Sequence, residues 1–557
     1  MKKISKIMLF LLLSVFTFEG CSNLLDVDSN RLVFPNGYQM NASNDTLYSM
    51  FGIFSQMEKL ADSYVLLGEL RGDLMDVTPT SNLFLKEINN FDISGNNPYA
   101  NNIKDYYSVI NNCNYVIHNI DTSVVKGGVK VMYKEYAACK AIRAWTYMQI
   151  VLNYGSAIYY EKPVLTVEDA ENIQKLSPLS LTELVPILVA DIAPWKDIDM
   201  PSLGFLFNHN TSNSYFPIRF LLGDLYLWTG QYENAANEYH DLMYKNSYIL
   251  NISYRNTRAV LNNAFTGNYT LFNFIGNSSE NITNIAATNQ YGQKFDLDSL
   301  TLNRMIAPSA VAITNWQKQK YFHSNTLDTL GDLRLLSSVV ALSSSKFPTS
   351  NNNFTTSTKI TETSNNFIYK YILLNYPTST QKINKEITPY RVPLLYLRYA
   401  EAVNRLGKPN LAMAVLKNGL KNSSIVNPKI VPKNELSVPL PNYMDFGITD
   451  VVKKNQFELN IGVRMRGCGN VNVDTTYYKI PKLEAIQDSI LYVEDLIQQE
   501  LSLETAFEGN RFHDLMRIAI RRDNNLYLAN LVSSKYNENK EAIRTKLSIR
   551  ENWYLKK

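Results

Sequence analysis

Apolar residues recur every three or four positions over several long stretches of this chain, which is the spacing that buries one face of an α-helix. We expect one helix over Asp105 to Ile120 and a second over Val131 to Leu152, which ends near Gly155. The same spacing continues over Phe216 to Lys245 and over Val392 to Leu420, where glycine-containing turns divide each stretch into two helices. The pattern therefore predicts a mainly α-helical fold.

The last two stretches alternate small and large residues, as tetratricopeptide helical pairs do. Small residues let antiparallel helices approach closely, and a glycine at the turn lets the chain leave the helix. In the first pair these residues are Gly223, Tyr226, Gly230, Tyr232, Ala235 and Tyr239, and in the second Ala400, Ala402, Leu406, Gly407, Ala412 and Leu416. Long insertions separate the pairs, so they do not predict a free solenoid.

The composition changes between about residues 246 and 389, where asparagine, serine and threonine become frequent. Short β-prone segments, such as Tyr269 to Ile275 and Phe367 to Leu374, interrupt this region. We predict a loop-rich insert with a few short strands, packed on a helical scaffold of residues about 40–245 and 390–557. Scaffold and insert are expected to form a single composite domain over residues 21–557.

The amino terminus has the organisation of an export signal. Lysines precede an apolar run from Ile7 to Phe18, and Gly20 stands just before Cys21. We expect residues 1–20 to be a lipoprotein signal peptide and Cys21 to carry the lipid that anchors the protein to a membrane. Ordinary secretion is the alternative, because Phe18 and Glu19 occupy positions where small or aliphatic residues are usual.

Charge and cysteine content exclude several classes of function. The chain has 55 basic and 51 acidic residues, and this near balance gives no reason to expect binding to nucleic acid. Beyond the signal peptide no apolar run is long enough for a membrane span. Cys113, Cys139 and Cys468 are too widely spaced for a disulfide framework or a zinc site, and we expect no metal or other cofactor.

Three glutamates near the carboxyl terminus are the strongest candidates for chemistry. Glu500, Glu504 and Glu508 are four residues apart and are expected to share one helix face, answered by Arg511 and Arg517. A carboxylate pair could hydrolyse glycosidic bonds, but two acids on one helix cannot flank a sugar from opposite sides. A structural ion-pair network is therefore the preferred interpretation, and no histidine or serine motif indicates another kind of catalysis.

Four segments together resemble the SusD/RagB family of Bacteroidetes outer-membrane nutrient-binding lipoproteins. They are Cys21 to Val27; Arg143 to Tyr147 ahead of Asn153-Tyr154-Gly155 and Pro163; Pro393 to Ala402; and Glu500, Glu504, Phe507, Glu508, Gly509, Arg511, Asp514, Leu515 and Arg517. Leu501 and Thr505 depart from the family pattern outside the core of the last motif. The resemblance extends over the whole chain.

The resemblance implies a lipid-anchored protein on the outer membrane that faces the cell exterior, captures an oligomeric nutrient and delivers it to a TonB-dependent, SusC-like channel. A glycan is the expected ligand; an oligopeptide is the alternative within the same architecture, and a surface glycoside hydrolase is the alternative from another class. The family places its ligand contacts on an early loop and on the central insert. The corresponding candidates are Trp316, Tyr291 and Tyr321 in the insert and Arg71, Asp73, Asn97 and Tyr99 in the early loop. Trp316 is the expected stacking platform, and an anchor for the insert is its alternative role.

Overall fold

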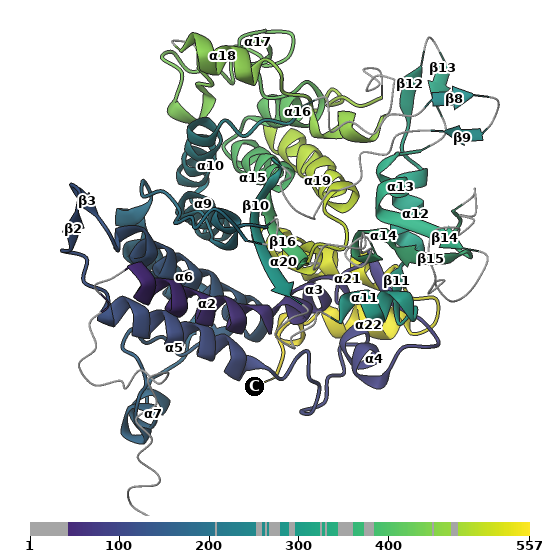
Figure 1. Ribbon diagram of the computed structural model, residues 1–557. Helices are drawn as coiled ribbons and strands as arrows, with labels where there is room; N and C mark the ends of the chain where they lie inside the picture. Colours follow the sequence, from purple (N-terminus) through teal and green to yellow (C-terminus); the bar gives the residue numbers. More distant parts are fainter. Residues whose placement is uncertain are drawn as a thin grey trace, which may run out of the picture.

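The computed structural model shows a mainly helical protein, as the sequence predicts (Figure 1). It describes residues 40, 43–206, 209–251, 259–261, 264–266, 279–288, 296–323, 326–328, 331–342, 360–372, 384–447, 450–468 and 477–556. Cys21, the signal peptide and Tyr291 lie outside the described residues. No helix in the described part of the chain is both long and apolar enough to cross a membrane.

The amino-terminal part is built on two long antiparallel helices. Helix α5 (Ile103–Asn119) packs along α6 (Tyr133–Tyr154), and α2 (Ser43–Glu58) lies against α5 (Figure 1). Both long helices follow the predicted ranges to within two residues at each end. Helix α6 ends where expected, because Gly155 adopts a left-handed conformation with φ of 81°.

The two predicted helical pairs are both present. Helices α9 (Ile218–Trp228) and α10 (Tyr232–Asn246) form the first, and α15 (Val392–Arg405) and α16 (Pro409–Lys417) the second. A Cβ on Gly223 would lie 2.3 Å from the Tyr239 ring, so only glycine permits this approach of α9 and α10. Helix α10 also packs on α15, which joins the two pairs.

The carboxyl-terminal helices close the structure against the beginning of the chain. Helix α19 (Ile486–Glu504) packs on α15 and α16, and α20 (Arg511–Arg521) lies against α3 (Ala61–Glu69). The prediction that all three glutamates share one helix is wrong, since α19 ends at Glu504 and Glu508 lies in the following turn. That turn touches α3 closely: a Cβ on Gly68 would lie 1.9 Å from the carbonyl oxygen of Gly509.

The described part of the insert contains more helix than the composition suggested. It includes α11 (Leu297–Leu302), α12 (Ala310–Gln317), α13 (Arg334–Ser338) and α14 (Tyr369–Ile372). One antiparallel strand pair joins the insert to the scaffold: β11 (Ile306–Pro308) with β1 (Met75–Val77). In the other, β10 (Asn281–Thr288) pairs with β16 (Asn384–Arg391), which runs out of the insert into α15, and β10 also packs on α2 of the scaffold. In the β1–β11 pair Asp76 lies opposite Ala307.

The remaining strands form small two-stranded antiparallel ribbons. They are β2 and β3 (Val125–Lys126, Val129–Lys130), β4 and β5 (Ser156–Ala157, Leu179–Ser180), β6 and β7 (Phe205–Leu206, His209–Asn210), β8 and β9 (Ala259–Leu261, Ala264–Thr266), β12 and β13 (Tyr321–His323, Thr326–Asp328), and β14 and β15 (Val339–Leu342, Asn365–Ile368). The remaining helices are α4 (Leu83–Asn89), α7 (Val167–Gln174), α8 (Leu181–Ile192), α17 (Asn422–Ile425), α18 (Val451–Phe457), α21 (Asn525–Ser533) and α22 (Lys540–Leu547). The 3₁₀ turns are η1 (Ala193–Trp195), η2 (Thr211–Ser214), η5 (Asn442–Met444), η6 (Val463–Gly467) and η7 (Arg550–Trp553).

One hydrophobic cluster runs from Met40 to Leu555 and includes side chains of the insert such as Trp316 and Ile368.

Candidate functional site

Trp316 lies in the core rather than on an exposed loop. It belongs to α12, its side chain is 0% exposed, and its indole N–H donates to the carbonyl oxygen of Leu503 at 3.1 Å. The ring also packs against Phe507, with 6.0 Å between ring centroids. Because no face of the ring is available to a ligand in this structure, its position favours the anchoring role that the sequence left as the alternative.

Tyr321 and Arg71 are buried as well. The Tyr321 hydroxyl donates to Asp332 at 2.5 Å, and the Arg464 guanidinium lies 4.9 Å from its ring centroid. The Arg71 guanidinium donates to the carbonyl oxygens of Leu67 at 2.7 Å and Trp553 at 3.0 Å. Burial lowers the pKa of Arg71 to about 10. Both side chains already have internal partners and do not reach the surface.

The early loop contributes only one partly exposed candidate. Asp73 is buried and accepts two hydrogen bonds from Arg511, at 2.5 and 2.8 Å. Asn97 is buried and donates to the carbonyl oxygen of Phe84 at 2.8 Å, which fixes the turn that carries it. Tyr99 is half-buried, and this burial raises the pKa of its hydroxyl to about 12. Of the described candidates, Tyr99 alone offers surface to a ligand.

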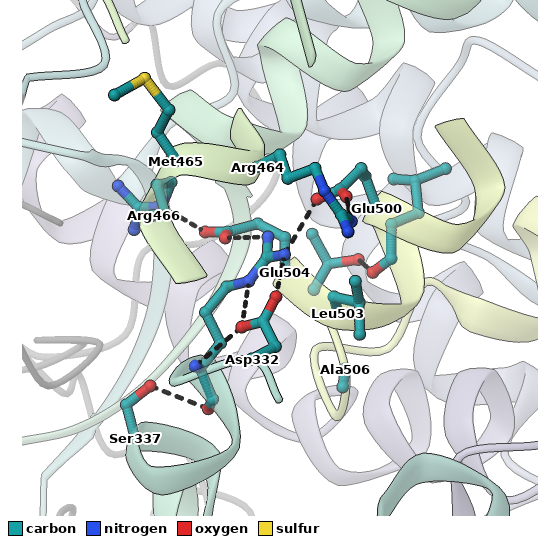
Figure 2. Close-up of polar contacts among 12 residues, drawn as sticks. Asp332, Ser337, Arg464, Met465, Arg466, Glu500, Leu503, Glu504 and Ala506 are labelled. Atoms are coloured by element: carbon teal, nitrogen blue, oxygen red, sulfur yellow. Dashed lines mark hydrogen bonds and ion pairs between the residues drawn. The ribbon is translucent and has the colours of Figure 1, made fainter. Parts of the chain in front are cut away.

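Glu500 and Glu504 lie in a buried cluster of charged side chains (Figure 2). Glu508 belongs to the same cluster, because it pairs with Lys370 and Arg391, each at 2.6 Å. Glu504 contacts three guanidinium groups: Arg391 at 2.8 Å, Arg466 at 2.9 Å and Arg334 at 3.1 Å. Glu500 contacts Arg334 and Arg464, each at 2.9 Å. The ion-pair network predicted from the sequence is therefore present, with other partners than those expected.

Among the described residues, the cluster contains as many cations as carboxylates. The cations are Arg334, Lys370, Arg391, Arg464 and Arg466, and the carboxylates are Glu280, Asp332, Glu500, Glu504 and Glu508. All ten side chains are buried. Burial alone would raise the pKa of Glu504, but Arg466, Arg391 and Arg334 hold it well below its usual value. A carboxylate with such a low pKa is a poor general acid, so this geometry does not support glycoside hydrolysis at these residues.

Arg511 and Arg517 do not pair with these glutamates, so that part of the prediction is wrong. Arg511 binds Asp73, and Arg517 binds Glu401 through two hydrogen bonds of 2.8 Å. The arginines that do pair with Glu500 and Glu504 come from other segments of the chain. The residues next to these arginines in the sequence form no pattern that identifies them as partners. Only the need of buried carboxylates for cations indicated that such arginines exist.

A second polar chain links a serine, a histidine and a glutamate. The Nε2 atom of His209 lies 2.7 Å from Ser214 Oγ, and its Nδ1 atom lies 2.8 Å from Glu386. Glu386 is buried and also accepts from Asn284 at 2.6 Å. Serine, histidine and glutamate follow one another as they do in a nucleophilic triad. However, His209 is buried, and its contacts join β7 to β10 and β16, so we assign this chain a structural role. The described residues contain no group of three His, Cys, Asp or Glu side chains that could hold a metal ion.

An open cleft lies between α5, the segment of residues 158–164 and α7. Its volume is about 800 Å³, within the range of ligand-binding pockets. The lining combines amides with aromatic and aliphatic side chains: Gln56, Ile103, Lys104, Tyr107, Ser108, Asn111, Asn112, Ile158, Tyr160, Val164, Ala170, Ile173 and Gln174. We call it the α5–α7 cleft. None of these residues was a candidate from the sequence.

Comparison with solved structures identifies the fold. A SusD superfamily protein from Bacteroides vulgatus ATCC 8482 is 15% identical and aligns with a TM-score of 0.56 over 94% of this chain and 96% of its own. A SusD-like carbohydrate-binding protein from Bacteroides fragilis NCTC 9343 is 16% identical, with a TM-score of 0.56 over 87% of each chain. A laminarin-binding SusD-like protein is 15% identical, with a TM-score of 0.53 over 90% of this chain and 96% of its own.

These likenesses show that the chain has the fold of SusD superfamily proteins, and they confirm the resemblance seen in the sequence at the level of the fold. No protein-family model matches the sequence, and no curated protein matches it.

Proposed function

We propose that this protein is a lipid-anchored binding protein that captures oligomeric carbohydrate at the outer surface of the outer membrane and passes it to a TonB-dependent channel. The observation that carries the proposal is the agreement in fold over almost the whole chain with SusD superfamily structures, two of which are named as carbohydrate-binding and laminarin-binding. The buried charge cluster adds support, because its carboxylates are committed to ion pairs rather than to chemistry.

Direct binding measurements test the carbohydrate part of the proposal. The purified protein without its signal peptide is run in native gels that contain laminarin, starch, xylan or pectin, and positive cases are measured by calorimetry with oligosaccharides of the same polymer. We expect retardation by at least one polymer and saturable heat of binding. Binding to a mixture of peptides, with none to any polysaccharide, would replace the carbohydrate by an oligopeptide.

The same samples distinguish binding from hydrolysis. Reducing ends are counted after long incubation of protein with each bound polymer, and the count is repeated after a second purification of the protein. A binding protein leaves the number of reducing ends constant. An increase that survives repurification would instead show a surface glycoside hydrolase.

The anchor and the channel need cellular experiments. Cys21 is the expected lipid acceptor, so labelling with a fatty acid should mark the wild-type protein and not Cys21→Ala, which should leave the membrane fraction. Affinity purification of the anchored protein should recover an outer-membrane channel. Equal labelling of both proteins would refute the anchor, and purification without a channel would refute the proposed delivery.

A further inference from the structure

The floor and one wall of the α5–α7 cleft are held rigidly by hydrogen bonds. The Asn111 side chain accepts from the amide of Val164 at 2.6 Å and donates to the carbonyl oxygen of the same residue at 3.1 Å. The Tyr107 hydroxyl accepts from the amide of Ile158 at 2.8 Å. These bonds attach the segment of residues 158–164 to α5 at both of its ends.

The same contacts place two aromatic rings side by side in the cleft. Tyr107 and Tyr160 are stacked, with 6.0 Å between ring centroids and 18° between ring planes. The backbone of Tyr160 is fixed by Tyr147, whose hydroxyl accepts from its amide at 3.0 Å and donates to its carbonyl oxygen at 2.9 Å. Both rings are half-buried, so each still presents surface to the cleft. Fixed aromatic surfaces lower the entropic cost of binding the apolar face of a ligand.

Polar groups without internal partners stand beside these rings. Asn112 is half-buried, and its side-chain amide makes no hydrogen bond within the described structure, although it can donate twice and accept twice. Gln174 on α7 is exposed toward the same space. Among the described lining residues only Lys104 carries a charge, and no carboxylate lines the cleft.

The second wall of the cleft is α7, a helix with a complete amino-terminal cap that buries none of its residues against the rest of the protein. Its amino terminus is closed by a capping box, in which Thr166 Oγ1 accepts from the amide of Asp169 at 3.1 Å and Asp169 accepts from the amide of Thr166 at 2.9 Å. None of its residues is buried, and the helix projects from the body beside α5 (Figure 1). Ala170 and Ile173 face the cleft and leave room that a ligand can fill.

From this geometry we infer that the α5–α7 cleft is a binding site for a linear, uncharged or weakly acidic oligosaccharide. Sugars offer hydroxyl groups to amides and a C–H face to aromatic rings, and the cleft supplies both kinds of group. Its volume suits an oligomer rather than a single sugar ring. A peptide amino terminus would find no carboxylate in the lining. This inference rests on the proposed carbohydrate binding and specifies where the ligand lies.

Two substitutions test the site without removing any internal hydrogen bond of the side chain. Asn112→Ala should weaken binding of the oligosaccharide identified in the native-gel screen by about 3- to 10-fold, because one or two hydrogen bonds to the ligand are lost. Tyr160→Ala should weaken it by about 10-fold or more, because its ring is removed while its backbone contacts remain. Asn537→Ala and Tyr477→Ala alter the same residue types at exposed positions outside the cleft and should bind like the wild type.

Hydrogen exchange gives a second measurement that does not depend on a variant. Saturating oligosaccharide should slow amide exchange in residues 158–164 and in α7 of the wild-type protein. If the wild type binds carbohydrate, but the cleft variants keep full affinity and this exchange is unchanged, the site is elsewhere and the proposed function stands. If the wild type binds no carbohydrate at all, the proposed function fails and the inference fails with it.

Discussion

Glu504→Gln is the sharpest test of the buried charge cluster. The substitution keeps the shape of the side chain and removes one negative charge from a cluster whose described members are five cations and five carboxylates. Three buried guanidinium groups then lose the carboxylate that they share. Both carboxylate oxygens are engaged: Oε1 faces Arg391 and Arg466, and Oε2 faces Arg334. The new NH₂ group must therefore point its hydrogens toward at least one guanidinium group, which also donates.

The expected cost follows from burial and chain length. Removing one partner from a buried, hydrogen-bonded ion pair destabilises a protein by about 3–5 kcal/mol, and the Glu504 side chain is 0% exposed. A chain of 557 residues has an unfolding entropy of about 1.2 kcal/mol per kelvin near 60 °C. The melting temperature should therefore fall by about 2.5–4 °C.

Scanning calorimetry at neutral pH and a fixed scan rate measures this change. Glu484→Gln is the matched control, because Glu484 is exposed and should melt within about 0.5 °C of the wild type. Oligosaccharide affinity should stay the same in both variants. An unchanged melting temperature in Glu504→Gln, or a loss of binding without a loss of stability, would refute the structural role of the cluster.

Two further predictions concern Trp316 and Asp62. Trp316→Phe should destabilise the protein by about 1–3 kcal/mol and leave ligand affinity unchanged, because it removes the hydrogen bond to Leu503 and opens a small void; weakened binding at wild-type stability would restore Trp316 as the stacking platform. Desolvation raises the pKa of Asp62 to about 7 in the folded protein, although the hydrogen bond from the Asp296 amide opposes this rise. The stability that Asp62 contributes is therefore fully present below its ordinary pKa and is lost as the pH rises to about 7. The stability of Asp62→Asn relative to the wild type should therefore increase from pH 5 to pH 8, and that of the control Asp92→Asn, at an exposed position, should not. Melting curves at the two pH values measure the difference. A difference in melting temperature between Asp62→Asn and the wild type that is the same at both pH values would contradict the raised pKa of Asp62.

Local sequence patterns predicted the helical scaffold because helices are made of contacts three and four residues apart. Helices α5, α6, α9, α10, α15 and α16 lie at the predicted positions. Gly155, Gly230 and Gly407 follow the ends of α6, α9 and α15, as expected. The partners of the buried glutamates could not be found in this way. Arg334 and Glu504 are 170 residues apart in sequence, and neither has a neighbour that indicates the other.

The ligand candidates show a different limit. Trp316 stands in a segment rich in polar residues, which suggested an exposed loop. The segment instead forms a short helix that Ser309 caps, and Trp316 lies on the buried face of this helix. Arg71 and Asp73 directly follow α3, and the chain at that point is covered by the carboxyl-terminal helices. Exposure depends on these distant segments, so position in a predicted loop does not establish it.

A signal for the cleft was present on α5 itself. The apolar stripe of Tyr106, Val109, Ile110 and Cys113 faces the core, and beside it runs a second stripe of Ile103, Tyr107, Ser108, Asn111 and Asn112 at the same helical spacing. A stripe that mixes aromatic rings and amides suits neither a dry core nor a fully solvated face. Such a stripe indicates a wet, partly covered surface, which is where polar ligands bind.

The buried cluster and the cleft depend on different parts of the chain. The cluster joins α19, η6, β16 and the described part of the insert, so directional ion pairs fix the insert on the scaffold. The cleft uses α5, residues 158–164 and α7, and it shares no lining residue with the cluster. Because one region holds its charges away from water and the other keeps amides without partners at the surface, stability and recognition reside in separate sets of side chains. Substitutions that change the ligand can therefore accumulate along the cleft without disturbing the ion pairs that hold the insert in place.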